Sequence, residues 1–177
     1  MNRRLAEGID VDAPRTDPTP VRAVVALGAN LGDRAATLDA AIAELRRLPL
    51  VDDVRASAPV ESVAVKPEGP DAAAPAYLNA VALVTTRLAP SLLLAFLQAI
   101  EARHGRERRE RWGDRTLDLD LISYGSVTSD DAVLTLPHPR AAERDFVLVP
   151  WLSIDPDAEL PGRGRVDVLL ERLRSGS

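Results

Sequence analysis

The chain has 177 residues, of which 46% are apolar, and a net charge of −5, values that fit one globular domain with its own hydrophobic core. The acidic balance argues against a general nucleic-acid binder, the absence of cysteine excludes disulfides and cysteine-based zinc sites, and two histidines are too few for a histidine-rich metal site. No apolar run approaches the roughly 20 residues that span a bilayer, and the N-terminus lacks the apolar segment of a signal peptide, so we expect a cytoplasmic protein.

The N-terminal part of the sequence predicts a leader followed by a first strand. Residues 1–20 are polar and rich in proline, which predicts disorder, and residues 21–177 are expected to form a single domain. An apolar run from Arg22 to Leu27 predicts the strand. The turn over residues 28–33 lacks the spacing and the lysine of a P-loop, so a plain strand-to-helix turn is preferred, with Asp33 as the helix cap.

Five further elements complete the expected core. Apolar spacing predicts, in chain order, a helix over Arg34–Leu48, strands over Val51–Ser57 and Tyr77–Thr86, a helix over Pro90–His104 and a strand over Thr116–Tyr124. This order is the βαββαβ unit of a ferredoxin-like α+β fold, with a mainly antiparallel sheet and both helices on one face. The other face is then expected to be free for a site.

Two regions outside this unit are less regular. Residues 59–75 show no clear period, and a mobile connector and a binding loop are equally open there. Towards the C-terminus we expect a helix or turn near Ala141–Leu148 and a final helix over Val166–Leu173, which together form a helical extension.

The strand that follows Thr116 alternates apolar and acidic residues. Its leucines would face a core, whereas Asp118 and Asp120 would stand roughly 6.6 Å apart on the opposite face. Carboxylates this close repel each other, and a bound divalent cation removes the repulsion. The alternative is the solvated face of an edge strand.

An arginine-rich segment lies just before this strand. Between Glu101 and Arg115, six arginines against four acidic residues leave a charge of +2. Guanidinium groups bind phosphate oxygens through paired hydrogen bonds, so arginines beside two aspartates indicate a site for a metal-bound polyphosphate. A salt-bridged helix end is the alternative.

Aromatic residues are scarce, so their positions are informative. Tyr77 and Asn79 begin the third strand, Phe146 lies near the C-terminal helices, and Trp112 lies in the arginine-rich segment. Two aromatic faces and an amide could hold a flat heterocycle, although core packing is open for each ring. His138, between two prolines, could donate a hydrogen bond to a phosphate or only stabilise its loop.

These features belong to a longer set of motifs. They are Arg111-Trp112-Gly113-Asp114-Arg115-Thr116-Leu117-Asp118-Leu119-Asp120-Leu121-Ile122, Gly28-Ala29-Asn30-Leu31-Gly32, Tyr77-Leu78-Asn79-Ala80, Ile100-Glu101, Gly105-Arg106, Leu136-Pro137-His138-Pro139-Arg140 and Arg144-Asp145-Phe146-Val147. With them in this order, the chain resembles the 6-hydroxymethyl-7,8-dihydropterin pyrophosphokinases from Val24 to about Leu160. The resemblance implies a ferredoxin-like fold and transfer of diphosphate from ATP to the hydroxymethyl oxygen of the pterin, releasing AMP, in folate biosynthesis.

The resemblance also implies roles for individual residues. The implied catalytic set is Arg106, Arg115, Asp118 and Asp120, with the two aspartates holding two Mg²⁺ ions. The implied ATP contacts are Gln98, Glu101, Arg106, Arg108, Arg115, His138 and Arg144, and the implied pterin contacts are Ser62, Val65, Tyr77, Asn79 and Phe146. The sequence departs from the family pattern at Asp114, where proline or a small residue is usual, and at Val63, where proline is common.

Two other functions stay open from the sequence. A ligand-sensing module on the same fold would need neither Asp118 nor Asp120. A small RNA binder would use the arginines and aromatics. That function predicts a basic face and aromatics in the middle of strands, and the sequence shows neither. We therefore expect ATP and the pterin as small-molecule partners, no nucleic acid, no membrane and a monomer.

Overall fold

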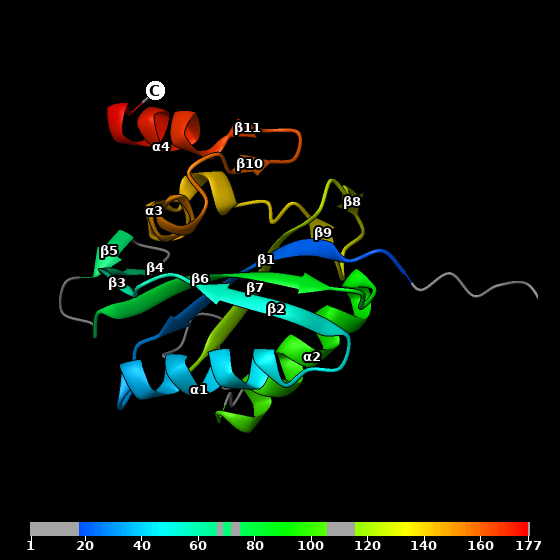
Figure 1. Ribbon diagram of the computed structural model, residues 1–177. Coiled ribbons are helices and arrows are strands. Elements are labelled where there is room, and N and C mark those ends of the chain that lie inside the picture. Colours follow the sequence, from blue (N-terminus) through cyan, green and yellow to red (C-terminus); the bar gives the residue numbers. More distant parts are fainter. Residues whose placement is uncertain (1–17, 67–68, 72–74, 106–115, 177) are drawn as a thin grey trace, which may run out of the picture.

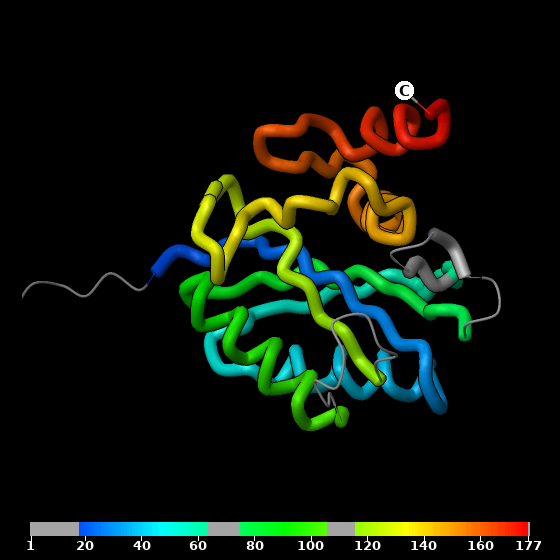
Figure 2. Tube along the Cα trace, turned by 180° about the vertical axis from the view of Figure 1, so that it is seen from behind, coloured from blue at the N-terminus to red at the C-terminus, as the bar shows by residue number. Residues whose placement is uncertain are grey.

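The chain forms three layers, with a sheet between two pairs of helices (Figures 1 and 2). The computed structural model describes residues 18–66, 69–71, 75–105 and 116–176. The sheet has the order β2-β6-β1-β7, and every pairing in it is antiparallel. Its strands are β1 (Val21–Ala29), β2 (Val51–Ala56), β6 (Tyr77–Thr86) and β7 (Asp118–Tyr124), with β3 (Val60–Ser62) paired to the start of β6. Helices α1 (Arg34–Arg46) and α2 (Pro90–Arg103) cover one face.

The predicted βαββαβ unit is confirmed, and each of its six elements lies within two residues of its expected bounds. The remaining elements are β4 (Ala64–Lys66), β5 (Gly69–Asp71), β8 (Ser129–Asp130), β9 (Thr135–Leu136), the 3₁₀ helix η1 (Ala141–Glu143), α3 (Asp145–Ile154), β10 (Glu159–Leu160), β11 (Gly164–Arg165) and α4 (Val166–Ser175). Three of the short strands, β3 to β5, fall in residues 59–75, where the sequence showed no period.

Local sequence signals set the helix starts. Asp33 caps α1 as expected, because its carboxylate accepts a hydrogen bond from the Ala36 backbone N–H at 3.0 Å. Gly32, just before it, has a φ of 63°, a conformation that favours glycine. Pro90 is the first residue of α2, where its missing N–H costs no helical hydrogen bond.

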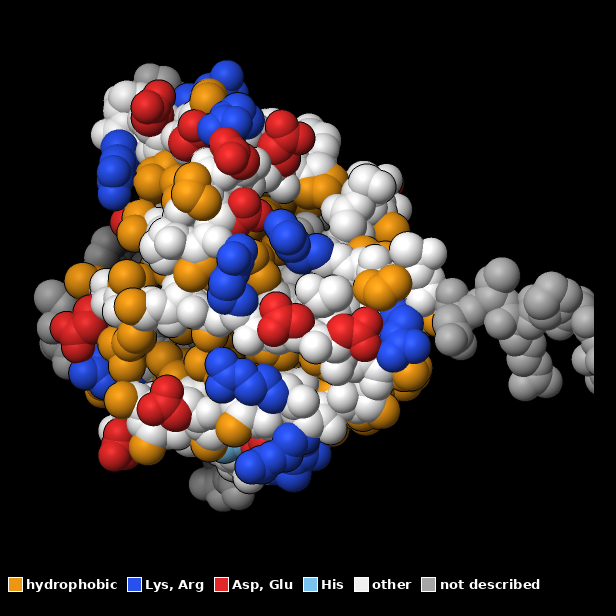
Figure 3. All heavy atoms as spheres, in the orientation of Figure 1, with side chains coloured by type: hydrophobic (Ala, Val, Ile, Leu, Met, Phe, Trp, Pro, Cys, Tyr) orange, Lys and Arg blue, Asp and Glu red, His pale blue; other side chains and the backbone are white. Residues whose placement is uncertain are grey.

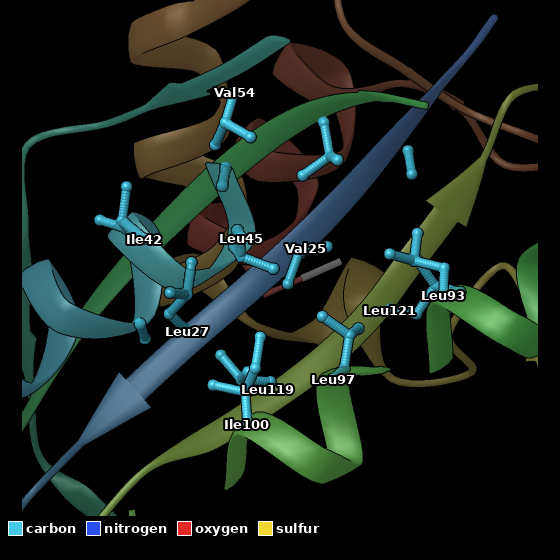
Figure 4. Close-up of a cluster of buried hydrophobic side chains, with 14 of the residues drawn as sticks. Val25, Leu27, Ile42, Leu45, Val54, Leu93, Leu97, Ile100, Leu119 and Leu121 are labelled. Atoms are coloured by element: carbon cyan, nitrogen blue, oxygen red, sulfur yellow. The ribbon is translucent and has the colours of Figure 1, made fainter. Parts of the chain in front are cut away.

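The first core lies between the sheet and helices α1 and α2. Figure 4 shows Ile42 and Leu45 of α1 and Leu97 of α2 directed towards Val25 and Leu119 of the strands. All five side chains are buried. Burial of these side chains is the main source of stability for this half of the molecule.

The second face of the sheet is not free, contrary to expectation. Helix α3 packs on it, and α4 packs against α3 and η1 (Figures 1 and 2); Leu148 and Trp151 of α3 are buried with Val81 and Ile122 of the sheet. The physical reason is that this face is also apolar over most of its length, so it must be covered to leave water. The expected helix or turn near Ala141–Leu148 is therefore η1 followed by the longer α3.

The expectations that the protein neither spans a membrane nor presents a basic face can be compared with the described residues. Within them, every helix is too short or too polar to cross a bilayer. Figure 3 shows acidic and basic side chains interspersed on the face it displays. The predicted leader falls almost wholly on residues 1–17, which lie outside the described residues, and it stays a prediction.

An ionic contact joins the C-terminal ends of α1 and α2. Glu44 accepts hydrogen bonds from Arg103 Nε at 2.8 Å and from His104 Nε2 at 2.7 Å. Partial burial raises the pKa of Glu44, but these hydrogen bonds and charges outweigh it, so the net pKa lies below the ordinary 4.5. The folded state thus favours the carboxylate more than the unfolded chain does.

This contact predicts a pH-dependent contribution to stability. A lowered folded-state pKa gives a contribution that is complete above about pH 4.5 and is lost as the pH falls through the folded-state value. Glu44→Gln should lower the free energy of unfolding by about 1 kcal/mol at pH 7, and by less at pH 3. Urea unfolding at both values, with Glu171→Gln as the exposed control, measures this, and an equal deficit at both would contradict it.

Candidate active site

Strand β7 carries the central acidic residues, with the predicted alternation. Leu119 and Leu121 are buried in the first core, together with Leu117 just before the strand. Asp118 and Asp120 lie half-buried on the other face. The sequence prediction that the leucines face a core and the aspartates oppose them is confirmed.

The pairing registers bring one residue from each of three strands into a row. Gly28 of β1 lies opposite both Asp118 of β7 and Asn79 of β6. Directly paired residues of an antiparallel sheet project to the same face, and neighbouring strands are about 4.8 Å apart. The carboxylate of Asp118 and the amide of Asn79 therefore arise from backbones roughly 10 Å apart, with no side chain between them.

Gly28 forms the floor between these two groups. A Cβ atom added there would lie 3.3 Å from Asn79 Oδ1 and 3.6 Å from a ring carbon of Tyr77. A side chain at this position would therefore crowd the Asn79 amide and the Tyr77 ring, and glycine lets both lie close to the strand. This role of Gly28 was not predicted, because the sequence motif placed Gly28 in the turn after the strand. The pairing of Gly28 with two polar strand residues appears only in the register of the sheet.

The Asn79 amide is held by the short strand β3. Its Nδ2 donates to Ser62 Oγ at 2.8 Å and to the Val60 carbonyl at 3.4 Å. Ser62 lies opposite Tyr77 in the β3–β6 pairing. The donor side of the amide is therefore occupied by β3, and its acceptor oxygen lies towards Gly28.

The residues around the start of α3 supply positive charge and a ring. Arg144 Nη1 donates to Asp120 Oδ2 at 2.9 Å, and the guanidinium carbon lies 5.8 Å from the centre of the Phe146 ring. His138 Nε2 lies 3.9 Å from the same Asp120 oxygen. Three residues expected to contact ligands are thus gathered beside Asp120.

His138 presents a hydrogen-bond donor to this group. Burial lowers the pKa of His138, with Arg144 and Arg140 acting in the same direction and Asp120 and Asp118 opposing them. The ring is therefore neutral at pH 7. Its Nδ1 accepts from the Arg140 backbone N–H at 3.2 Å, so the hydrogen is on Nε2, the atom that faces Asp120.

Glu101 of α2 supports the strand that carries the aspartates. It is 1% exposed, and its Oε1 accepts a hydrogen bond from the Leu119 backbone N–H at 2.7 Å. Gln98, one turn earlier on α2, is exposed on the helix side of the sheet. The expected ATP contacts of these two residues stay predictions.

Several expected site residues belong to parts of the chain that the structure does not describe. Arg106, Arg108, Trp112, Asp114 and Arg115 lie outside the described residues, and so does the side chain of Val65. The residues flanking the arginine-rich segment are described, and they lie close together: a Cβ atom on Gly105 would lie 4.0 Å from Thr116 Oγ1. The two described residues that flank this segment, Gly105 and Thr116, are therefore neighbours in space.

The assembled groups suit a metal-bound phosphate beside a flat ring. Among the described residues, no three acidic or histidine side chains form a group that could hold a metal ion by themselves. Two carboxylates with further positions left to phosphate oxygens and water are what Mg²⁺ takes in nucleotide sites. Arg144 and His138 add donors for anionic oxygens, and Tyr77, Asn79 and Phe146 offer faces and an edge for a heterocycle.

Comparison with known proteins identifies a family that this chain matches. Residues 24–156 match the family described as 7,8-dihydro-6-hydroxymethylpterin-pyrophosphokinase. The 2-amino-4-hydroxy-6-hydroxymethyldihydropteridine pyrophosphokinase of Synechocystis sp. is 43% identical over 148 residues, which are 84% of this chain and 73% of that protein. The protein of the same name from Haemophilus influenzae is 40% identical over 152 residues, which are 86% of this chain and 92% of that protein.

Solved structures show the same fold. The Plasmodium falciparum HPPK-DHPS A437G structure with STZ-DHP superimposes with a TM-score of 0.66 at 12% identity, covering 92% of this chain. This chain spans about half of that one, 48%. At such low identity the similarity establishes the architecture alone.

The Glu101 contact predicts a difference between two substitutions. Glu101→Gln keeps an oxygen that can accept from Leu119, whereas Glu101→Ala leaves a buried N–H without an acceptor and should cost about 1–3 kcal/mol. Urea unfolding and hydrogen exchange of the Leu119 amide measure the two effects. Equal stability of Glu101→Ala and the wild type, with unchanged exchange at Leu119, would show that the contact contributes nothing.

Proposed function

Because this chain belongs to the 7,8-dihydro-6-hydroxymethylpterin-pyrophosphokinase family, we propose that it transfers the diphosphate group of ATP to 6-hydroxymethyl-7,8-dihydropterin. The hydroxymethyl oxygen attacks the β-phosphorus and loses its proton to water. The bond between the β-phosphorus and the α,β-bridging oxygen breaks, and AMP leaves with that oxygen. The product is the pterin diphosphate, an intermediate of folate biosynthesis.

The observation that carries this proposal is the row of Asp118, Gly28 and Asn79 across the sheet. A pterin whose edge meets Asn79 would extend its hydroxymethyl group over Gly28 towards Asp118. The hydroxymethyl oxygen of the pterin and the phosphate chain of ATP would then meet above this row, between the strands that carry Asn79 and Asp118. Phosphoryl transfer depends mainly on such positioning and on charge stabilisation, so no covalent nucleophile is needed.

Asp118 and Asp120 are the proposed ligands of Mg²⁺, and two ions are the number we expect. Bound Mg²⁺ would neutralise phosphate charge and lower the pKa of a coordinated hydroxyl. Asp120 is already oriented by Arg144, and its side chain is 30% exposed, so one carboxylate is both held in place and open to solvent. The spacing of Asp118 and Asp120 along one strand suits two carboxylates that bind adjacent ions, or one ion together with its phosphates.

The phosphate chain is the proposed partner of the positive groups. Arg144 and the Nε2–H of His138 face the Asp120 carboxylate, where both can donate to phosphate oxygens. Arg115 is three residues before Asp118, so chain geometry keeps their Cα atoms within about 11 Å. We propose the remaining ATP contacts by family resemblance, namely Gln98, Glu101, Arg106 and Arg108.

The pterin is proposed to bind at the Asn79 end of the row. Tyr77 and Phe146 would stack on its two faces, and Asn79 would accept from its edge through Oδ1. Ser62 accepts a hydrogen bond from the Asn79 amide and so orients it. For Val65, contact with the pterin is proposed from the family resemblance alone.

The direct test is incubation of the protein with Mg-ATP and 6-hydroxymethyl-7,8-dihydropterin, followed by analysis of the nucleotide products. AMP in equal amount to the pterin diphosphate is expected, and none should form when EDTA removes Mg²⁺. Release of ADP would indicate transfer of a single phosphoryl group. Binding of the pterin without any turnover would instead favour the ligand-sensing module.

Removal of either carboxylate should abolish most of the turnover. Asp118→Asn and Asp120→Asn keep the side-chain size but remove charge worth several kcal/mol in the transition state, a loss of roughly 100-fold or more in kcat. ATP affinity should change far less. Asp53→Asn, an exposed carboxylate on β2, is the matched control. Turnover of either variant near the wild-type rate would refute the metal assignment.

Substitution of the proposed stacking ring should act on pterin binding. Phe146→Leu removes the ring, and the KM for the pterin should rise roughly 10-fold, as expected for a lost base–aromatic stack. Phe146→Tyr keeps the ring and should stay near the wild type. Steady-state kinetics with each substrate varied separates this from an effect on ATP, and equal kinetics of both variants would argue against stacking.

A further inference from the structure

Arg34 bridges the two chain segments that lead into the proposed pterin site. It is the first residue of α1, and its Nη1 donates to the Ala76 carbonyl at 2.6 Å while its Nη2 donates to Glu61 Oε1 at 2.8 Å. Ala76 directly precedes Tyr77, and Glu61 directly precedes Ser62. One guanidinium group therefore binds the residues that precede two proposed pterin contacts.

Arg34 lies on the face of the sheet opposite the proposed pterin site. Glu61 lies opposite Leu78, and Leu78 packs against the first core, which is the side of α1. Tyr77 and Asn79 project to the other face, beside Gly28. Arg34 is thus separated from the proposed substrate by the sheet itself, so its effect must pass through the strands.

Within the part of the chain that the structure describes, strand β3 is held by its pairing with β6 and by contacts with α3. It is three residues long and pairs with β6, and its Ser62 accepts the hydrogen bond that orients the Asn79 amide. A short edge strand forms few backbone hydrogen bonds with its neighbour. The two charge-assisted hydrogen bonds of Arg34, which join β3 to the residue before β6, therefore add appreciably to the placement of β3. The ion pair with Glu61 is screened by solvent, because the Arg34 and Glu61 side chains are 30% and 64% exposed, so the partly buried hydrogen bond to the Ala76 carbonyl is the stronger of the two contacts.

We propose that Arg34 is a positioning residue for the pterin. It holds β3 against the start of β6 and thereby fixes Ser62, the Asn79 amide and the Tyr77 ring in the geometry that binds the heterocycle. This inference rests on the proposed function of the site. Arg34 contributes to pterin affinity and leaves the metal and phosphate side of the site unchanged, because Asp118 and Asp120 lie on a different strand.

The test compares substitutions of both partners. Arg34→Ala should raise the KM for the pterin roughly 10-fold, the scale seen when groups supporting a binding residue are removed. The KM for ATP, and kcat at saturating pterin, should stay within about twofold of the wild type. Arg34→Lys should recover part of the loss, since one ammonium replaces a two-pronged donor. Arg87→Ala, which breaks the exposed ion pair with Asp52 on the same sheet, is the control and should change neither KM.

Glu61→Gln tests the same idea without risk to folding, because the Glu61 side chain is 64% exposed. It should raise the pterin KM in the same direction but less than Arg34→Ala, since the Ala76 contact survives. An unchanged pterin KM in both Arg34→Ala and Glu61→Gln, in a wild type that releases AMP, overturns the positioning role alone. Parallel increases in both KM values also overturn it. A wild type that releases no AMP overturns the proposed function, and this inference with it.

Discussion

Strand β7 can be buried in only one way, and the whole site depends on that constraint. Its leucines must face the helices, because a shift of one residue would put Asp118 and Asp120 into an apolar core without partners. The hydrophobic effect therefore places two carboxylates side by side on the other face. Glu101 strengthens the arrangement, since its buried carboxylate accepts the Leu119 N–H on the strand itself.

The second face of the sheet combines burial and chemistry along its length. Most of it is apolar and is covered by α3, on which α4 packs, whereas the end near Asp118 carries polar groups. The apolar residues of α3 dock that helix, and docking brings its N-cap residue Arg144 and Phe146 of its first turn to the edge of the polar region. Packing energy thus orients the charged and aromatic groups, which keeps the reorganisation needed on ligand binding small.

Much of this was predictable because it depends on local periods and motifs. The alternation of β7 and the helical stripes of α1 and α2 are read over a few residues, and the β–α–β order then limits the fold to few topologies. The short strands β3 to β5 were not predicted, since three residues are too few to show a period. The covered second face was also missed, because the helical signal after Ala141 did not say which surface it would meet.

The sequence by itself determined the six core elements, the acidic face of β7 and the resemblance to a pyrophosphokinase family, since each is encoded by neighbouring residues. Only the tertiary structure decided that Arg144 meets Asp120, that Gly28 separates Asp118 from Asn79, and that Arg34 reaches Ala76. These pairs are brought together by strand register and helix docking. Both follow from packing of the whole core, in which distant side chains must fill one another's space, and no local period records that outcome.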